Sequence, residues 1–129
     1  MRIDRKYDDL TQHLKPGKVL IIFGSRQVGK TTLVRDYLNN SQWKYRYDVG
    51  DDLRIQEVLS SMNSELLSEY VEGYDLIVID EAQKIQNIGT SLKIIVDKHP
   101  DIRIIATGSS SFELSGQLGE PLTGRKKTL

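Results

Sequence analysis

Two glycines, a lysine and a hydroxyl side chain lie between Gly24 and Thr31 at a spacing typical of phosphate binding. The segment fits the pattern G-x-x-x-x-G-K-[ST] throughout, and it lies between an apolar run and a helical pattern, where this mechanism requires it. Glycines let the backbone wrap closely around phosphate oxygens, so that its N–H groups face the anion. We expect Lys30 to neutralise the β- and γ-phosphates of ATP, and the Thr31 hydroxyl to bind Mg²⁺. The residues predicted to contact the nucleotide are Gly24, Ser25, Arg26, Gln27, Val28, Gly29, Lys30, Thr31 and Thr32.

A carboxylate pair, Asp80-Glu81, follows the four apolar residues Leu76 to Ile79. Ligands of open α/β sheets bind at the carboxyl ends of the strands, so the pair is placed to reach the same nucleotide. Asp80 is suited to hold Mg²⁺ through water, and Glu81 could polarise the water that attacks the γ-phosphate. The alternative is that the two acids begin a helix as its N-cap.

Polar residues also end the next apolar run, at Thr107, Ser109 and Ser110. One of these side chains, with Ser109 as the main candidate, could lie between the γ-phosphate and the acidic pair and sense the phosphate. The alternative is a serine-rich turn that caps a helix beginning near Phe112. Arg125 is the best internal candidate for an arginine that faces the γ-phosphate, although most surface arginines are simply solvated.

The elements that must position these residues follow from hydrophobic spacing. Apolar runs and alternating patterns predict strands at 19–23, 45–49, 76–79 and 102–106, the second of them more exposed. Apolar residues at helical spacing predict helices over 31–38, over 52–71 with a break near Asn63-Ser64, and over 88–96. Strands that alternate with helices indicate a parallel sheet in an α/β sandwich.

Composition limits the function classes. The chain has 129 residues, which suits one domain, and its 18 basic and 18 acidic residues give no net charge that would attract nucleic acid or an anionic membrane. It has no cysteine and two histidines, which excludes disulfides and Cys-ligated zinc. The apolar runs are too short to cross a bilayer and no secretory signal begins the sequence, so we expect a cytoplasmic protein without a membrane partner.

Four segments together are more specific than any one of them: GSRQVGKTTL, LIVIDEAQKI, IIATGSSSFEL and LTGR. With these segments the chain resembles the prokaryotic AAA-like P-loop ATPases that usually carry a nuclease-like C-terminal domain. The resemblance implies a sheet of order 5-1-4-3-2, with the fifth strand missing or incomplete here, and an acidic strand at neither edge. Ser25 departs from the proline that the family often has. Because the family continues past the Gly-Arg at 124–125, the resemblance implies an N-terminal ATPase fragment.

The predicted activity is Mg²⁺-dependent hydrolysis of ATP coupled to a conformational output that the sequence does not identify. Its partners would be ATP and ADP, together with later domains of the full-length chain or a neighbouring subunit that supplies an arginine, and DNA stays an open candidate. The fragment alone would then be weakly active. Two alternatives remain open: a nucleotide-controlled switch with negligible turnover, and a fragment of a helicase-like motor. The helicase is disfavoured because about fifty residues separate Lys30 from Asp80 and no second motor domain follows.

Overall fold

The computed structural model describes residues 14–23, 28–108 and 126–128, and the side chains of 14–22 and 34–108 among them. In chain order the strands and helices are β1 (Lys18–Phe23), α2 (Val28–Asn40), β2 (Tyr45–Val49), α3 (Leu53–Leu59), α4 (Ser64–Val71), β3 (Leu76–Asp80), the 3₁₀ turn η1 (Ala82–Lys84), α5 (Ile88–Lys98), β4 (Arg103–Gly108) and β5 (Lys126–Thr128).

The five strands form one sheet in the order β2-β3-β4-β1-β5, and every neighbouring pair is parallel. This confirms the predicted fold class and the order 5-1-4-3-2. The fifth strand is present in incomplete form, as three residues beside β1. The acidic strand β3 lies between β2 and β4, away from both edges.

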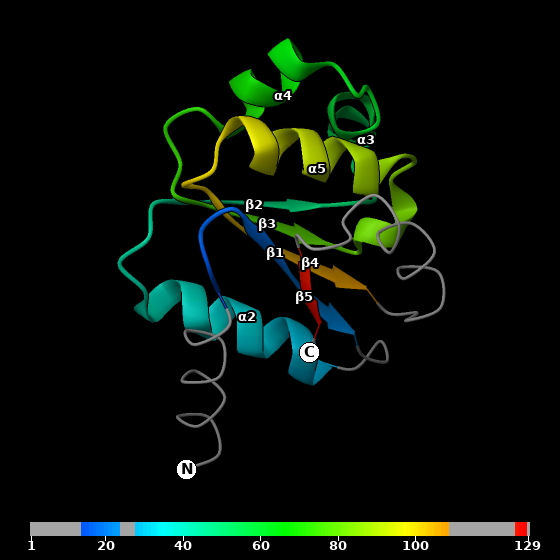
Figure 1. The fold of residues 1–129 in the computed structure, drawn as a ribbon. Coiled ribbons are helices and arrows are strands. Elements are labelled where there is room, and N and C mark those ends of the chain that lie inside the picture. The colour runs from blue at the N-terminus through cyan, green and yellow to red at the C-terminus, as the bar shows by residue number, and fades with distance from the viewer. Residues whose placement is uncertain (1–13, 24–27, 109–125, 129) are drawn as a thin grey trace.

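Helices cover both faces of the sheet (Figure 1). Helix α2 lies on one face, while α3, α4 and α5 lie on the other. Strand residues alternate between the two cores because successive side chains point to opposite faces. Leu76 and Val78 pack on the α2 side, and Ile77 and Ile79 pack on the α5 side, all fully buried.

Local polar residues set the boundaries of two helices. The predicted break in the 52–71 helix is confirmed, since α3 ends at Leu59 and α4 begins at Ser64. Asn63 is the N-cap of α4. Its side chain accepts hydrogen bonds from the backbone N–H groups of Glu65 and Leu66, which satisfies two donors at the start of α4. Asp52 caps α3 in the same way, through the N–H of Arg54.

Two elements extend beyond the segments that hydrophobic spacing marks. Helix α2 runs from Val28 to Asn40, so it begins close to Gly29, where the phosphate-loop mechanism requires a helix start, and the last residues of that pattern form its first turn. Strand β4 extends to Gly108, which places Thr107 inside the sheet. Both extensions bring predicted site residues onto regular elements at the carboxyl edge of the sheet.

Candidate functional site at the carboxyl edge of the sheet

The predicted site residues that the structure describes gather at one edge of the sheet. Register places Asp80 beside Val49 of β2, and Ile79 beside Ala106 of β4, so Thr107 lies next to Asp80. Strand β1 ends at this same edge, and α2 begins five residues later, at Val28. The N-terminus of α2 therefore lies at the same edge of the sheet as the acidic strand end. The free N–H groups and the dipole of a helix N-terminus favour an anion.

Part of the predicted phosphate loop falls outside the described residues. Gly24, Ser25, Arg26 and Gln27 are not described, while the backbone of Val28, Gly29, Lys30, Thr31 and Thr32 forms the first turns of α2. The side chains of Lys30 and Thr31 are outside the description too. Ser109, Ser110 and Arg125 lie outside it altogether.

Asp80 is a buried carboxylate, with 9% of its surface exposed. The Thr107 hydroxyl donates to its Oδ1 at 2.5 Å, and the Tyr47 hydroxyl donates to its Oδ2 at 2.6 Å. Among the side chains that the structure describes, no cation forms an ion pair with it. Each oxygen of an ionised carboxylate can accept about two hydrogen bonds, and the described residues supply one to each Asp80 oxygen.

Glu81 adopts a left-handed backbone conformation directly after the strand, with φ of 56° and ψ of 46°. A non-glycine residue is uncommon in this region, and such strain is often found at functional sites. The Glu81 N–H donates to Thr107 Oγ1 at 3.3 Å, and Gln83 Nε2 donates to Glu81 Oε1 at 2.7 Å. Although Glu81 occupies the N-cap position of η1, its side chain makes no capping hydrogen bond. The N-cap alternative for the acidic pair therefore does not account for the Glu81 carboxylate.

The turn after β2 contacts the turn that begins with the Asp80-Glu81 pair, which we call the acidic turn. The Gly50 N–H donates to the Asp80 carbonyl at 2.7 Å, and a Cβ at Gly50 would lie 2.1 Å from the Glu81 carbonyl oxygen. Because no heavy atom fits at that distance, this position has room for glycine alone. Lys84 and Asp51 add an ion pair of 2.7 Å between the same two turns.

Sequence reasoning missed Tyr47 and Gly50, which both contact the acidic turn. Tyr47 belongs to a strand that the sequence identified, but its contact with Asp80 depends on which strands are neighbours. Gly50 is a glycine directly after a strand, and this is a signal for a close backbone approach that could have been used.

The donor set fits a magnesium ion carried by a nucleotide. Within the described part of the chain, no three His, Asp or Glu side chains form a group that could hold a metal by themselves. Mg²⁺ usually keeps several waters and is bound through one or two protein oxygens together with substrate phosphates. A single buried carboxylate at the edge of the sheet where a helix begins matches that mode.

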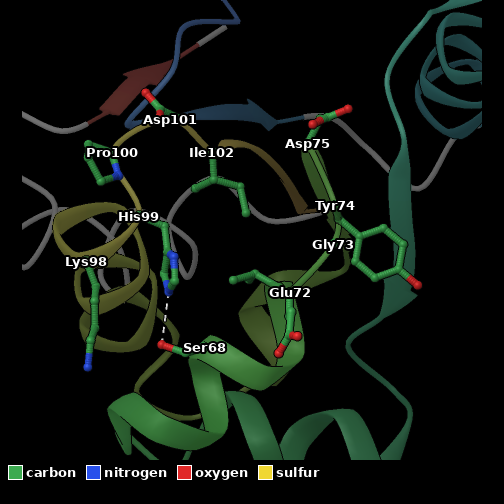
Figure 2. Close-up of a pocket in the computed structure, with 11 residues that line it drawn as sticks. Ser68, Glu72, Gly73, Tyr74, Asp75, Lys98, His99, Pro100, Asp101 and Ile102 are labelled. Atoms are coloured by element: carbon green, nitrogen blue, oxygen red, sulfur yellow. Dashed lines mark hydrogen bonds between the residues drawn. The ribbon is translucent and has the colours of Figure 1, made fainter.

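A cavity of about 600 Å³ lies at the other end of the sheet (Figure 2). Its walls come from the segments that lead into β3 and β4, and include Ser68, Tyr74, His99 and Ile102. The Ser68 hydroxyl and His99 Nε2 lie 2.9 Å apart. The cavity lies at the amino ends of β3 and β4, and is therefore separate from the candidate site at their carboxyl ends.

A sequence profile described as an AAA domain matches residues 16–129, which is most of the chain. The chain belongs to the AAA domain family. Among curated protein sequences, none matches this AAA domain significantly.

Solved structures resemble the AAA domain at the level of the fold. Domain III of the replication initiation protein DnaA from Thermotoga maritima has a TM-score of 0.58 and 17% identity, covering 97% of this chain and 60% of that one. A replication initiator DnaA bound to AMPPCP and single-stranded DNA gives 0.55 and 16%, covering 97% and 44%. The flagellar accessory protein FlaH from Methanocaldococcus jannaschii gives 0.51 and 17%, covering 98% and 78%. The AAA domain spans between 43% and 60% of the length of the replication initiators that it matches.

None of the helices in the described residues combines the length and the apolar character that crossing a membrane requires.

Proposed function

We infer that this AAA domain binds ATP with Mg²⁺ and hydrolyses it to ADP and phosphate, coupled to a conformational output that is not identified. The observation that carries the inference is the buried Asp80 carboxylate at the sheet edge where α2 begins. Burying a carboxylate without a compensating cation is costly, so a site of this kind favours a positively charged ligand. Phosphates at a helix N-terminus bring such a cation with them.

Each residue has a separate proposed task. The backbone from Gly24 to Thr32 surrounds the phosphates, and Lys30 neutralises the β- and γ-phosphates. Thr31 and Asp80 would hold the Mg²⁺, the first through its hydroxyl and the second through a water molecule. Magnesium would supply charge neutralisation for the transferring phosphoryl group. Ser109 is proposed to sense the γ-phosphate.

Glu81 is proposed to act as the general base. It would accept a proton from the attacking water, whose oxygen forms the new bond to the γ-phosphorus as the bond to ADP breaks. Two observations support this assignment: the strained backbone at Glu81, and the Gln83 amide, which holds one carboxylate oxygen at 2.7 Å.

An arginine that faces the γ-phosphate would complete the site. Arg125 is the internal candidate, and the next residue, Lys126, pairs with Val19. Arg125 itself lies outside the described residues. The alternative is an arginine from a neighbouring subunit or a later domain, and such an arginine is worth roughly 10³ to 10⁵ in rate. We also propose, from the family resemblance, that this chain is part of a longer cytoplasmic ATPase with a nuclease-like C-terminal domain. DNA is retained as a candidate partner.

The test compares Glu81→Gln and Lys30→Ala in the full-length protein. Glu81→Gln should bind ATP with near-normal affinity while single-turnover hydrolysis falls by roughly 10² to 10⁴. Lys30→Ala should lose nucleotide affinity without loss of the fold. If the parent protein binds ATP but shows no hydrolysis with enzyme in excess, the alternative of a nucleotide-controlled switch replaces the proposed reaction. If Glu81→Gln hydrolyses ATP at the parent rate, Glu81 is not the base.

A further inference from the structure

Tyr47 is a polar contact of the site to which the proposed reaction assigns no task. Its hydroxyl donates to Asp80 Oδ2, while the Thr107 hydroxyl donates to Asp80 Oδ1. One donor on each oxygen fixes the rotation of the carboxylate plane. Thr107 also accepts the N–H of Glu81, so its hydroxyl is held by the acidic turn itself. Tyr47 is the donor that comes from a different element, the edge strand β2.

The Tyr47 ring lies between Asp80 and the helix that carries the phosphate-loop residues. The Arg35 guanidinium of α2 lies over this ring, 5.3 Å from its centroid. Arg35 is four residues after Thr31, which is about one helical turn. The contacts from Arg35 to Tyr47 and from Tyr47 to Asp80 therefore link the middle of α2 to the end of β3.

A cavity of about 220 Å³ also borders Tyr47, and it is lined by Arg35, Leu38, Asn39, Tyr45 and Tyr47. The Tyr47 ring is half-buried. Burial, followed by the hydrogen bond to Asp80, raises the pKa of Tyr47 to about 12, although Arg35 partly opposes this. At neutral pH the hydroxyl is protonated and remains a donor.

We propose that Tyr47 is a positioning residue for magnesium: it fixes the orientation of the Asp80 carboxylate, which would hold the metal ion through water. The proposal rests on the proposed function, because it requires that Mg²⁺ is bound with the nucleotide at this edge. Hydrogen-bond partners of a metal-binding group orient that group, and their loss typically weakens metal affinity by about 10- to 100-fold. Tyr47 should therefore affect the gain in nucleotide affinity that Mg²⁺ provides, and leave metal-free nucleotide binding unchanged.

The test is titration calorimetry of the full-length protein with AMPPCP, once with Mg²⁺ and once with a chelator. The measured quantity is the ratio of the two dissociation constants. In Tyr47→Phe this ratio should fall about tenfold, while the dissociation constant in chelator stays within about twofold of the parent value. Two controls should keep the parent ratio. Tyr45→Phe changes a tyrosine of the same strand and cavity whose hydroxyl makes no hydrogen bond to described residues, and Tyr70→Phe removes a tyrosine–aspartate hydrogen bond on the opposite face.

A double-mutant cycle shows whether Tyr47 acts through Asp80. In an Asp80→Asn background, Tyr47→Phe should change the ratio by no more than about twofold, because contacting residues are not additive. If Tyr47→Phe keeps the parent ratio while Asp80→Asn loses it, the positioning role is wrong and the proposed function stands. If Mg²⁺ does not strengthen AMPPCP binding to the parent protein, both are wrong. Urea unfolding of each variant verifies that it is folded.

Discussion

On each face of the sheet a tyrosine hydroxyl donates a hydrogen bond to an aspartate. The two pairs differ in the other groups that donate to the carboxylate. On the α2 face, Asp80 accepts hydroxyl hydrogen bonds from Tyr47 and Thr107. On the opposite face, Asp48 accepts the Tyr70 hydroxyl at 2.5 Å, together with the Arg46 guanidinium at 2.8 Å.

The charge balance of the two pairs is therefore different. Asp48 has a cation within the chain, since Arg46 also lies over the Tyr70 ring at 4.1 Å and donates to the Tyr70 carbonyl. Burial alone would lower the pKa of Arg46, but its hydrogen bond to Asp48 and the charge of Asp48 raise it above the usual value. Among described side chains Asp80 has neutral donors alone. A carboxylate with its own cation stabilises the fold, whereas one without a described cation is suited to bind a ligand that brings one.

Asp80→Asn tests the ligand-binding half of this comparison and should have the largest effect. The amide keeps the shape but loses the charge, so Mg²⁺-dependent single-turnover hydrolysis should fall by about 100-fold or more. The free energy of unfolding should change by less than about 1 kcal/mol, because relief of a buried charge offsets the weakened hydrogen bonds. A large loss of stability in urea, with hydrolysis unaffected, would mean that Asp80 is a structural residue.

Asp48→Asn should show the reverse pattern. It breaks the ion pair with Arg46 and weakens the bond from Tyr70, and the two charged side chains are 18% and 33% exposed. Hydrogen bonds to charged groups contribute about 1.5 to 3 kcal/mol, so we expect the free energy of unfolding to fall by about 2 kcal/mol. Urea unfolding measures this change, and calorimetric titration with ADP and Mg²⁺ should give an unchanged affinity. A loss of ADP affinity in a folded variant would remove the distinction between the two pairs.

The sequence predicted a role for Asp80 but none for Tyr47 or Asp48, and there is a physical reason for the difference. Asp80 could be predicted because it follows an apolar strand in a chain with a phosphate-loop pattern. The sheet order came from a resemblance to a known family, and the elements from hydrophobic spacing. Tyr47 and Asp48 are adjacent in sequence and lie on opposite faces, and their partners come from β3 and α4. Which partner each one meets depends on strand register and helix packing, which periodicity alone does not specify.

Gly50→Ala tests whether the shape of the acidic turn matters separately from its charges. The added Cβ would lie 2.1 Å from the Glu81 carbonyl oxygen, so the backbone of one of the two turns must move. Overpacking typically costs about 1 to 3 kcal/mol, and the shift should also displace Glu81 and slow hydrolysis.

Gly73→Ala is the matched control, because Gly73 has a φ of 85° but nothing within 4 Å of an added Cβ. It should lose about 1 kcal/mol through backbone strain while hydrolysis remains normal. Equal hydrolysis rates in the two variants would contradict a role for this contact.

Alkaline pH should produce the smallest effect and rank the two tyrosines by burial. Burial, and then the bond to its aspartate, raises the pKa of Tyr47 to about 12 and that of Tyr70 well above its ordinary value of 10. Because the unfolded chain releases these protons first, the free energy of unfolding should decrease as the pH rises from about 10 towards 12. The Tyr47 contribution should be about 1 kcal/mol or less, since partial exposure reduces it, and the Tyr70 contribution should be larger.

Urea unfolding of the parent, Tyr47→Phe and Tyr70→Phe at about pH 9.5, 10.5 and 11.5 isolates each contribution, because titration of the lysines is common to all three. Tyr70→Phe should flatten the pH dependence more than Tyr47→Phe does. The same slope in all three proteins would mean that neither tyrosine has a raised pKa in the folded protein.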